Sequence, residues 1–122
     1  MKRNVLVVDD EPNMRLLIRL ILEEGDMTVL EASSGEEALE FLASSSPDVV
    51  LLDIRLPGID GWEVLERMRG DDRMRRIPVV GISAHASATP KVAAERGCVA
   101  FLSKPFRAEE LLEAMEIALQ AA

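Results

Sequence analysis

Acidic side chains follow two runs of apolar residues, each at the point where the run ends. Asp9 and Asp10 follow Asn4–Val8, and Asp53 follows Val49–Leu52. Short runs rich in β-branched residues are typical of strands buried on both faces of a parallel sheet. An ionised carboxylate at the carboxyl end of such a strand is unfavourable in free energy unless a cation pairs with it. We therefore expect a cation beside these carboxylates.

Two further polar residues stand at the same kind of position. Ser83 ends the run Pro78–Ile82, and Lys104 follows the run Ala100–Ser103. Lys104 would supply a mobile positive charge and Ser83 a hydroxyl, which suits an anionic ligand such as a transferring phosphoryl group.

Strand order decides whether these residues meet. Ligands of open α/β sheets bind beyond the carboxyl ends of the strands, beside the point where the strand order reverses. In the order 2-1-3-4-5 the first and third strands flank that point, so Asp9, Asp10 and Asp53 would converge. Carboxylates so close repel one another, and a hard divalent cation with oxygen ligands, best of all Mg²⁺, offsets the repulsion.

The elements that must position these residues can be predicted from periodicity, caps and chain breakers. A further strand is expected at Thr28–Ala32. Helices are expected from Pro12 up to Gly25, from about Gly35 to Ala43, from Gly61 to Met68, from Pro90 to about Arg96, and from Ala108 to Leu119. Five strands alternating with five helices predict an α/β fold with a parallel sheet.

Two local expectations accompany this pattern. Leu16 and Leu20 widen the apolar stripe of the first helix, which we therefore expect to be well covered. Arginines and aspartates of mixed sign fill Arg67–Arg76, which we interpret as a solvated loop.

Composition excludes several classes of function. The 122 residues are 48% hydrophobic, enough for one core, so residues 1–122 are predicted to form one domain. A net charge of −8 argues against direct binding to nucleic acid. No apolar run approaches a membrane span or a signal peptide, so we expect a cytoplasmic protein without membrane contact. Cys98 stands alone, so neither a disulfide nor a thiolate metal site is expected.

The chain resembles the response-regulator receiver domains of bacterial two-component signalling over essentially its whole length. The resemblance is carried by four motifs in order and at the right spacing: Val7-Val8-Asp9-Asp10-Glu11, Asp53-Ile54-Arg55-Leu56-Pro57-Gly58-Ile59-Asp60-Gly61, Ser83-Ala84 and Lys104-Pro105-Phe106. It implies the flavodoxin-like, or CheY-like, fold: five parallel strands in the order 2-1-3-4-5 flanked by five helices.

The resemblance also implies roles for individual residues. Asp53 would be the phosphoacceptor, with Lys104 and Ser83 contacting the phosphoryl oxygens. Mg²⁺ would be held by Asp10 and Asp53 directly, by Asp9 largely through water, and by the backbone carbonyl of Arg55. Phe101 would be the switch aromatic that moves with Ser83, Arg55 and His85 would tune hydrolysis of the acyl phosphate, and the Lys104–Pro105 bond would be cis.

The implied activity is not that of a conventional enzyme, since the domain would catalyse its own Mg²⁺-dependent phosphorylation and dephosphorylation. A sensor histidine kinase or a phosphotransfer protein would donate the phosphoryl group. The face made by the fourth helix, fifth strand and fifth helix would then bind a downstream protein or an output domain.

Ser83 to Gly97 is one residue shorter than the resemblance implies, so we expect a short and mobile fourth helix. The final helix reaches Ala122 without a linker, which favours a stand-alone or excised domain.

Three other functions remain open. A flavodoxin-like cofactor binder shares the topology but needs a hydroxyl- and glycine-rich loop where this chain has Asp9–Pro12. An aspartate-nucleophile phosphatase usually has a second Asp two residues after the nucleophile, where Arg55 stands here. A degenerate receiver would serve only as a protein-interaction platform.

Overall fold

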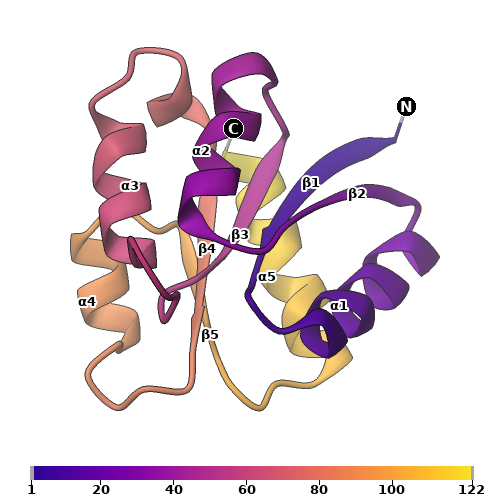
Figure 1. Ribbon diagram of the computed structural model, residues 1–122. Helices are drawn as coiled ribbons and strands as arrows, with labels where there is room; N and C mark the ends of the chain where they lie inside the picture. The colour runs from indigo at the N-terminus through magenta and orange to yellow at the C-terminus, as the bar shows by residue number, and fades with distance from the viewer. Residues whose placement is uncertain (1, 122) are drawn as a thin grey trace.

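The computed structural model describes residues 2–121, which form one parallel sheet covered by helices on both faces (Figure 1). The strands lie in the order β2-β1-β3-β4-β5, as predicted. The elements in chain order are β1 (Arg3–Val8), α1 (Pro12–Glu24), β2 (Met27–Ala32), α2 (Gly35–Ser44), β3 (Val49–Asp53), α3 (Gly61–Arg69), the 3₁₀ turn η1 (Met74–Arg76), β4 (Val79–Ser83), α4 (Pro90–Glu95), β5 (Ala100–Ser103) and α5 (Ala108–Ala121).

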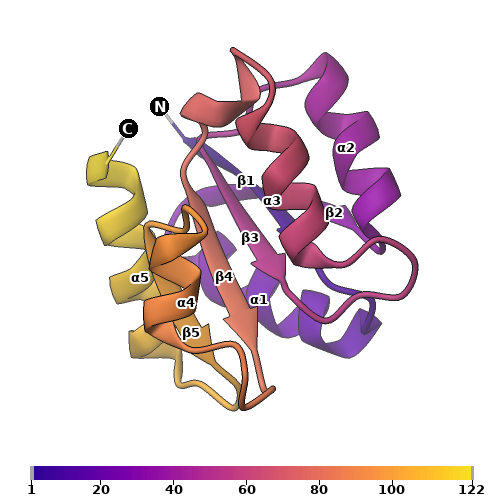
Figure 2. The ribbon, with the colours of Figure 1, turned by 90° about the vertical axis from the view of Figure 1, so that its left-hand side faces the viewer.

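The central strand β3 is buried along its whole length and divides the core into two layers. Val50 and Leu52 pack with side chains of α2 and α3, whereas Val49 and Leu51 pack with side chains of α1 and α5. This follows from the alternation of side chains along a strand. Accordingly α1 and α5 cover one face of the sheet, and α2, α3 and α4 cover the other (Figures 1 and 2).

The predicted helix starts have the expected caps. Pro12 occupies the first turn of α1, and the hydroxyl of Ser34 accepts a hydrogen bond from the Glu37 backbone N–H at 3.1 Å. The Glu37 carboxylate in turn accepts from the Ser33 backbone N–H at 2.7 Å. The first contact satisfies a donor that a helix start leaves free, and the second holds the residue that precedes the cap.

One local expectation is wrong and another is incomplete. Leu16, Leu17 and Leu20 of α1 are 46–57% exposed, because the helix turns only its Ile18 and Leu22 side fully into the core. The stretch predicted as a solvated loop contains η1, because the Asp71 carboxylate accepts hydrogen bonds from two backbone N–H groups and so closes a turn. The exposed Arg73 also donates hydrogen bonds from its guanidinium to the Leu42 and Ser45 carbonyls at the end of α2.

No helix among residues 2–121 combines the length and the apolar character that crossing a membrane requires. Cys98 is a free, buried thiol, and its burial raises its pKa to about 11.

Candidate functional site

The carboxyl ends of β1 and β3 bring three carboxylates together. The two strands pair in register up to Val8 and Leu52, so the next residues, Asp9 and Asp53, emerge at the same edge of the sheet (Figure 2). Asp9, Asp10 and Asp53 each place a carboxylate oxygen within 4.8 Å of the others. The predicted convergence is therefore confirmed.

Lys104 lies across this acidic group. Its Nζ is 3.0 Å from Asp9 Oδ2 and 3.0 Å from Asp53 Oδ2. Its backbone N–H donates to the Ser83 carbonyl at 3.0 Å, which ties the end of β5 to the end of β4. The following peptide bond to Pro105 is cis, as the family resemblance implied.

Both carboxylate oxygens of each buried aspartate already accept a hydrogen bond. Asp9 Oδ1 accepts from the Glu11 backbone N–H at 2.9 Å, and Asp53 Oδ1 accepts from the Arg55 backbone N–H at 3.0 Å. Both side chains are nearly inaccessible, at 1% and 5% exposure, whereas Asp10 is exposed. Asp10 is thus the carboxylate of the three most open to a ligand from solvent.

Burial and charge act in opposite directions on the ionisation of this group. Burial raises the pKa of Asp53 from 3.8 to about 6, although the hydrogen bond and the charge of Lys104 act to lower it. Burial of Lys104 by itself would lower the pKa of the ammonium, but its hydrogen bonds to Asp53 and Asp9 outweigh burial and raise it. One ammonium therefore faces three carboxylates, which leaves an excess of negative charge in a partly buried cluster.

A cavity of about 330 Å³ opens onto this group. It is lined by Asp10, Glu11, Asp53, Arg55, Ala84, His85 and Lys104. Several oxygen donors with a negative charge excess suit a hard cation such as Mg²⁺ better than a soft metal, since the described residues bring no Cys or His into the cluster.

The residues that line the cavity do not include Ser83 or Phe101. Ser83 is buried, and its Oγ accepts a hydrogen bond from the His85 backbone N–H at 3.0 Å, which leaves the hydroxyl proton free to be donated. Phe101 is partly buried and pairs in register with Gly81, where a Cβ would approach the Phe101 ring to 3.2 Å. The absence of a side chain at Gly81 therefore makes room for the aromatic ring.

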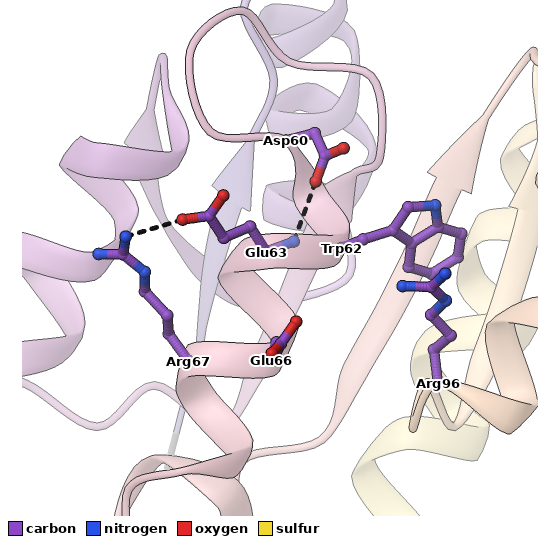
Figure 3. Close-up of a pocket in the computed structure, with 6 residues that line it drawn as sticks. All are labelled: Asp60, Trp62, Glu63, Glu66, Arg67 and Arg96. Carbon is purple, nitrogen blue, oxygen red and sulfur yellow. Dashed lines mark hydrogen bonds and ion pairs between the residues drawn. The ribbon is translucent and has the colours of Figure 1, made fainter.

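A larger hollow of about 690 Å³ lies between α3 and the end of α4 (Figure 3). Both of its arginines already have partners: Arg67 pairs with Glu63 at 2.7 Å, and the Arg96 guanidinium lies 5.0 Å from the centre of the Trp62 ring. Because it holds no converging carboxylates, we place the chemistry in the smaller acidic cavity.

Sequence reasoning missed two contributors to the site. Glu11 lines the acidic cavity, and Arg15 donates a hydrogen bond from Nη1 to the Asp9 carbonyl at 2.7 Å. The available signal was the spacing of Arg15 and Arg19 on one side of a helix, with a single acid, Glu31, in the neighbouring strand. That spacing predicts an ion pair with Glu31, but it does not predict which backbone carbonyl accepts a hydrogen bond from Arg15 Nη1.

The response regulator receiver domain family matches residues 5–116 of the chain. The response regulator Rre1 of Synechocystis is 38% identical over 110 residues, covering 88% of this chain and 48% of the relative. The polar-differentiation response regulator DivK of Brucella anthropi is 35% identical over 118 residues, covering 95% of both chains.

Solved structures agree with this match. The chemotaxis response regulator CheY4 of Vibrio cholerae superposes with a TM-score of 0.89 at 25% identity, over 98% of this chain and all of the other. The chain spans about half the length of several curated relatives that it matches, from 46% to 51%.

Proposed function

The chain belongs to the response regulator receiver domain family of two-component signalling, and from that premise we propose that Asp53 is its phosphoacceptor. The observation that carries the assignment is the position of Asp53: buried at the end of β3, 3.0 Å from Lys104 and at the edge of the acidic cavity. Residues 1–122 would form one receiver domain that catalyses its own phosphorylation and dephosphorylation.

The chemistry assigned to Asp53 is nucleophilic. A carboxylate oxygen forms a bond to phosphorus while the bond from phosphorus to the imidazole nitrogen of a phosphohistidine breaks, and its electron pair stays with the imidazole. The product is an acyl phosphate, which water later hydrolyses to return the free carboxylate. A sensor histidine kinase or a phosphotransfer protein would be the donor.

The other residues of the cavity have separate tasks. The Lys104 ammonium, already beside Asp53, would move to a phosphoryl oxygen and offset its charge. Ser83 would donate its free hydroxyl proton to another phosphoryl oxygen, and Phe101 would move with it. His85 and Arg55 line the same cavity as Asp53, so they would control access of water to the acyl phosphate and tune its lifetime.

Mg²⁺ is the cation that the oxygen donors fit. As the family resemblance implies, Asp10 and Asp53 would hold it directly, with the Arg55 carbonyl, and Asp9 would act largely through water. When bound, Mg²⁺ would supply charge stabilisation to the phosphoryl oxygens.

The phosphorylated domain would signal through the face made by α4, β5 and α5, which would contact a downstream protein or an output domain. A platform without phosphorylation is disfavoured, because such a domain has no need for the complete set of Asp9, Asp10, Asp53, Ser83 and Lys104.

Incubation with acetyl phosphate tests the proposal. We expect Mg²⁺-dependent addition of one phosphoryl group to the wild-type protein, seen by intact mass, and none to Asp53→Asn. Equal incorporation into the variant would exclude Asp53 as the acceptor, and equal incorporation when Mg²⁺ is chelated before acetyl phosphate is added would exclude the role of the metal.

A further inference from the structure

Arg15 of α1 joins the acidic cavity to the edge of the sheet. Its side chain is only 16% exposed. Nη1 donates to the Asp9 carbonyl at 2.7 Å, and Nε donates to Glu31 Oε1 on the edge strand β2 at 2.9 Å. The guanidinium thus uses two of its donors to span two elements, which a single ammonium could not do with the same geometry.

The oxygen that Arg15 holds belongs to the peptide unit between Asp9 and Asp10. Because a peptide unit is planar, the direction of the Asp9 carbonyl fixes the position of the Asp10 nitrogen and Cα as well. Asp9 itself is fixed at all three oxygens, since Lys104 and the Glu11 N–H bond its carboxylate. Asp10 has an exposed side chain, so its placement depends on this backbone more than on packing.

Glu31, the second hydrogen-bond partner of Arg15, is itself held in place. Glu31 Oε2 accepts from Arg19 Nε at 2.8 Å, and this hydrogen bond, against a smaller opposing effect of burial, keeps the pKa of Glu31 below its usual value. Glu31 is therefore a charged and fixed partner for Arg15. The loop that carries Asp9, Asp10 and Glu11 is tied through it to β2.

We propose that Arg15 is a positioning residue for the cation site: it orients the Asp9–Asp10 peptide and so places the Asp10 carboxylate to bind Mg²⁺. The inference rests on the proposed function, in which Asp10 is a metal ligand. Arg15 does not itself touch the metal.

Charge and position predict opposite effects of losing this side chain. If Arg15 acted only through its positive charge, its removal would strengthen the binding of a cation nearby. If it acts by orienting Asp10, its removal weakens binding. The sign of the change in affinity therefore separates the two roles.

Arg19 offers a matched control. It lies one helical turn from Arg15, carries the same charge and bonds the same Glu31, but its other bonds go to Glu23 and the Val29 carbonyl, away from the cavity. We expect Arg15→Gln to weaken Mg²⁺ binding, measured calorimetrically, by about tenfold, the usual scale for partners that orient ligands. Arg19→Gln, which removes neither hydrogen bond of Arg15, is expected to change the affinity much less than Arg15→Gln does, and Arg15→Lys, which keeps the charge but not the paired donors, is expected to resemble Arg15→Gln.

Metal-free hydrogen exchange gives a second readout that a loss of global stability alone would not explain. The Glu11 amide, bonded to Asp9 Oδ1, should exchange faster in Arg15→Gln than in Arg19→Gln when both are compared at equal global stability. Unchanged or tighter Mg²⁺ binding in Arg15→Gln, or equal exchange in the two variants, overturns the proposal. Absence of Mg²⁺ binding by the wild type would overturn the metal site itself, while the exchange comparison would still decide whether Arg15 orders the loop.

Discussion

Asp53 has an unfavourable environment for a carboxylate in the metal-free protein. Burial is the largest influence on it, and Lys104 compensates only in part, since the same ammonium also serves Asp9. Because ionisation of this carboxylate is unfavourable in free energy, a bound cation or conversion to an acyl phosphate would stabilise the site. The cost of placing Asp53 here is therefore consistent with a functional rather than a structural reason for its position.

This environment predicts a dependence of stability on pH. The pKa of Asp53 is raised from 3.8 to about 6, so the folded state binds the proton more tightly than the unfolded state does. The stabilising contribution of Asp53 is then complete below about pH 3.8 and is lost as the pH rises to about 6.

Asp53→Asn removes the ionisable group, and with it the loss of stability that occurs as Asp53 ionises. Without Mg²⁺, the variant should be more stable than the wild type at pH 7 by about 1–2 kcal/mol, a value reduced from the roughly 3 kcal/mol of a two-unit shift to allow for solvent screening. The gain should shrink toward zero near pH 4 in urea unfolding curves. A gain that is constant with pH would show that Asp53 is not the group that titrates.

At the scale of single residues, the sequence was sufficient wherever a side chain projects directly from a strand end. Asp9, Asp53, Ser83 and Lys104 lie where their strands predict. Arg15 was not predictable, because its contact depends on how α1 leaves the β1 loop, and strand and helix patterns do not encode that angle.

The elements around the site leave little free space at Gly61, the first residue of α3. A Cβ there would lie 2.6 Å from the Asp53 carbonyl oxygen and 2.7 Å from the Ile54 Cα, both backbone atoms that cannot rotate away. Helix α3 therefore packs directly against the end of β3.

Gly61→Ala should destabilise the protein by about 1–3 kcal/mol, the usual cost of overpacking. Gly70→Ala is the control, since its Cβ would meet only ordinary contacts from 3.6 Å and its backbone is already right-handed helical. That variant should be neutral or more stable by about 0.4–1 kcal/mol. Equal effects of the two changes in guanidinium unfolding would show that the close approach at Gly61 is relieved by a small backbone shift.

Helix α4 is the least anchored helix of the fold. It spans only Pro90–Glu95, and Ala93 is its single buried residue. Beyond its Thr89 cap, its end is held by the Arg69 guanidinium on the Arg96 carbonyl at 2.9 Å and by the Arg96 side chain over Trp62 (Figure 3). A cation over an aromatic ring at an exposed site is worth only about 0.5–1 kcal/mol.

We predict that residues 84–96 are the most mobile part of the unphosphorylated domain and change most on phosphorylation. Their amides should exchange faster than those of β3, and should slow when Mg²⁺ and beryllofluoride, a phosphoryl mimic, are added. Arg96→Ala should accelerate exchange in α4 further, whereas Lys91→Ala, on the same helix, should not. Protection equal to that of β3 before the mimic is added, and unchanged afterwards, would refute the prediction.

The sequence predicted the presence of each helix and strand better than the burial of its side chains. The five strands and all five α-helices followed from apolar runs, caps and breakers, because these are local signals, whereas the strand order came from the family resemblance. The exposure of Leu16 and Leu20 did not, since an apolar stripe on α1 gives no information on how far the neighbouring α5 extends over it.

For the whole molecule, convergence of the three carboxylates predicts that Mg²⁺ stabilises the fold. A ligand bound only by the native state at a hundredfold excess over its Kd adds about 2.7 kcal/mol. Thermal unfolding with and without Mg²⁺ should show this gain in the wild type and little of it in Asp10→Ala. Asp72→Ala, which removes the same charge from a side chain that is 95% exposed, should keep the gain. A wild-type melting temperature indifferent to Mg²⁺ would contradict the site.

Identification of the modified residue tests the central claim, phosphorylation of Asp53, most directly. Borohydride reduces an aspartyl phosphate to homoserine, so protein treated with acetyl phosphate and Mg²⁺ can be reduced, digested and sequenced by mass spectrometry. We predict homoserine at position 53 alone, and only when both reagents were present. Homoserine at Asp9 or Asp10, or a phosphoryl group that survives acid on another residue, would contradict the assignment.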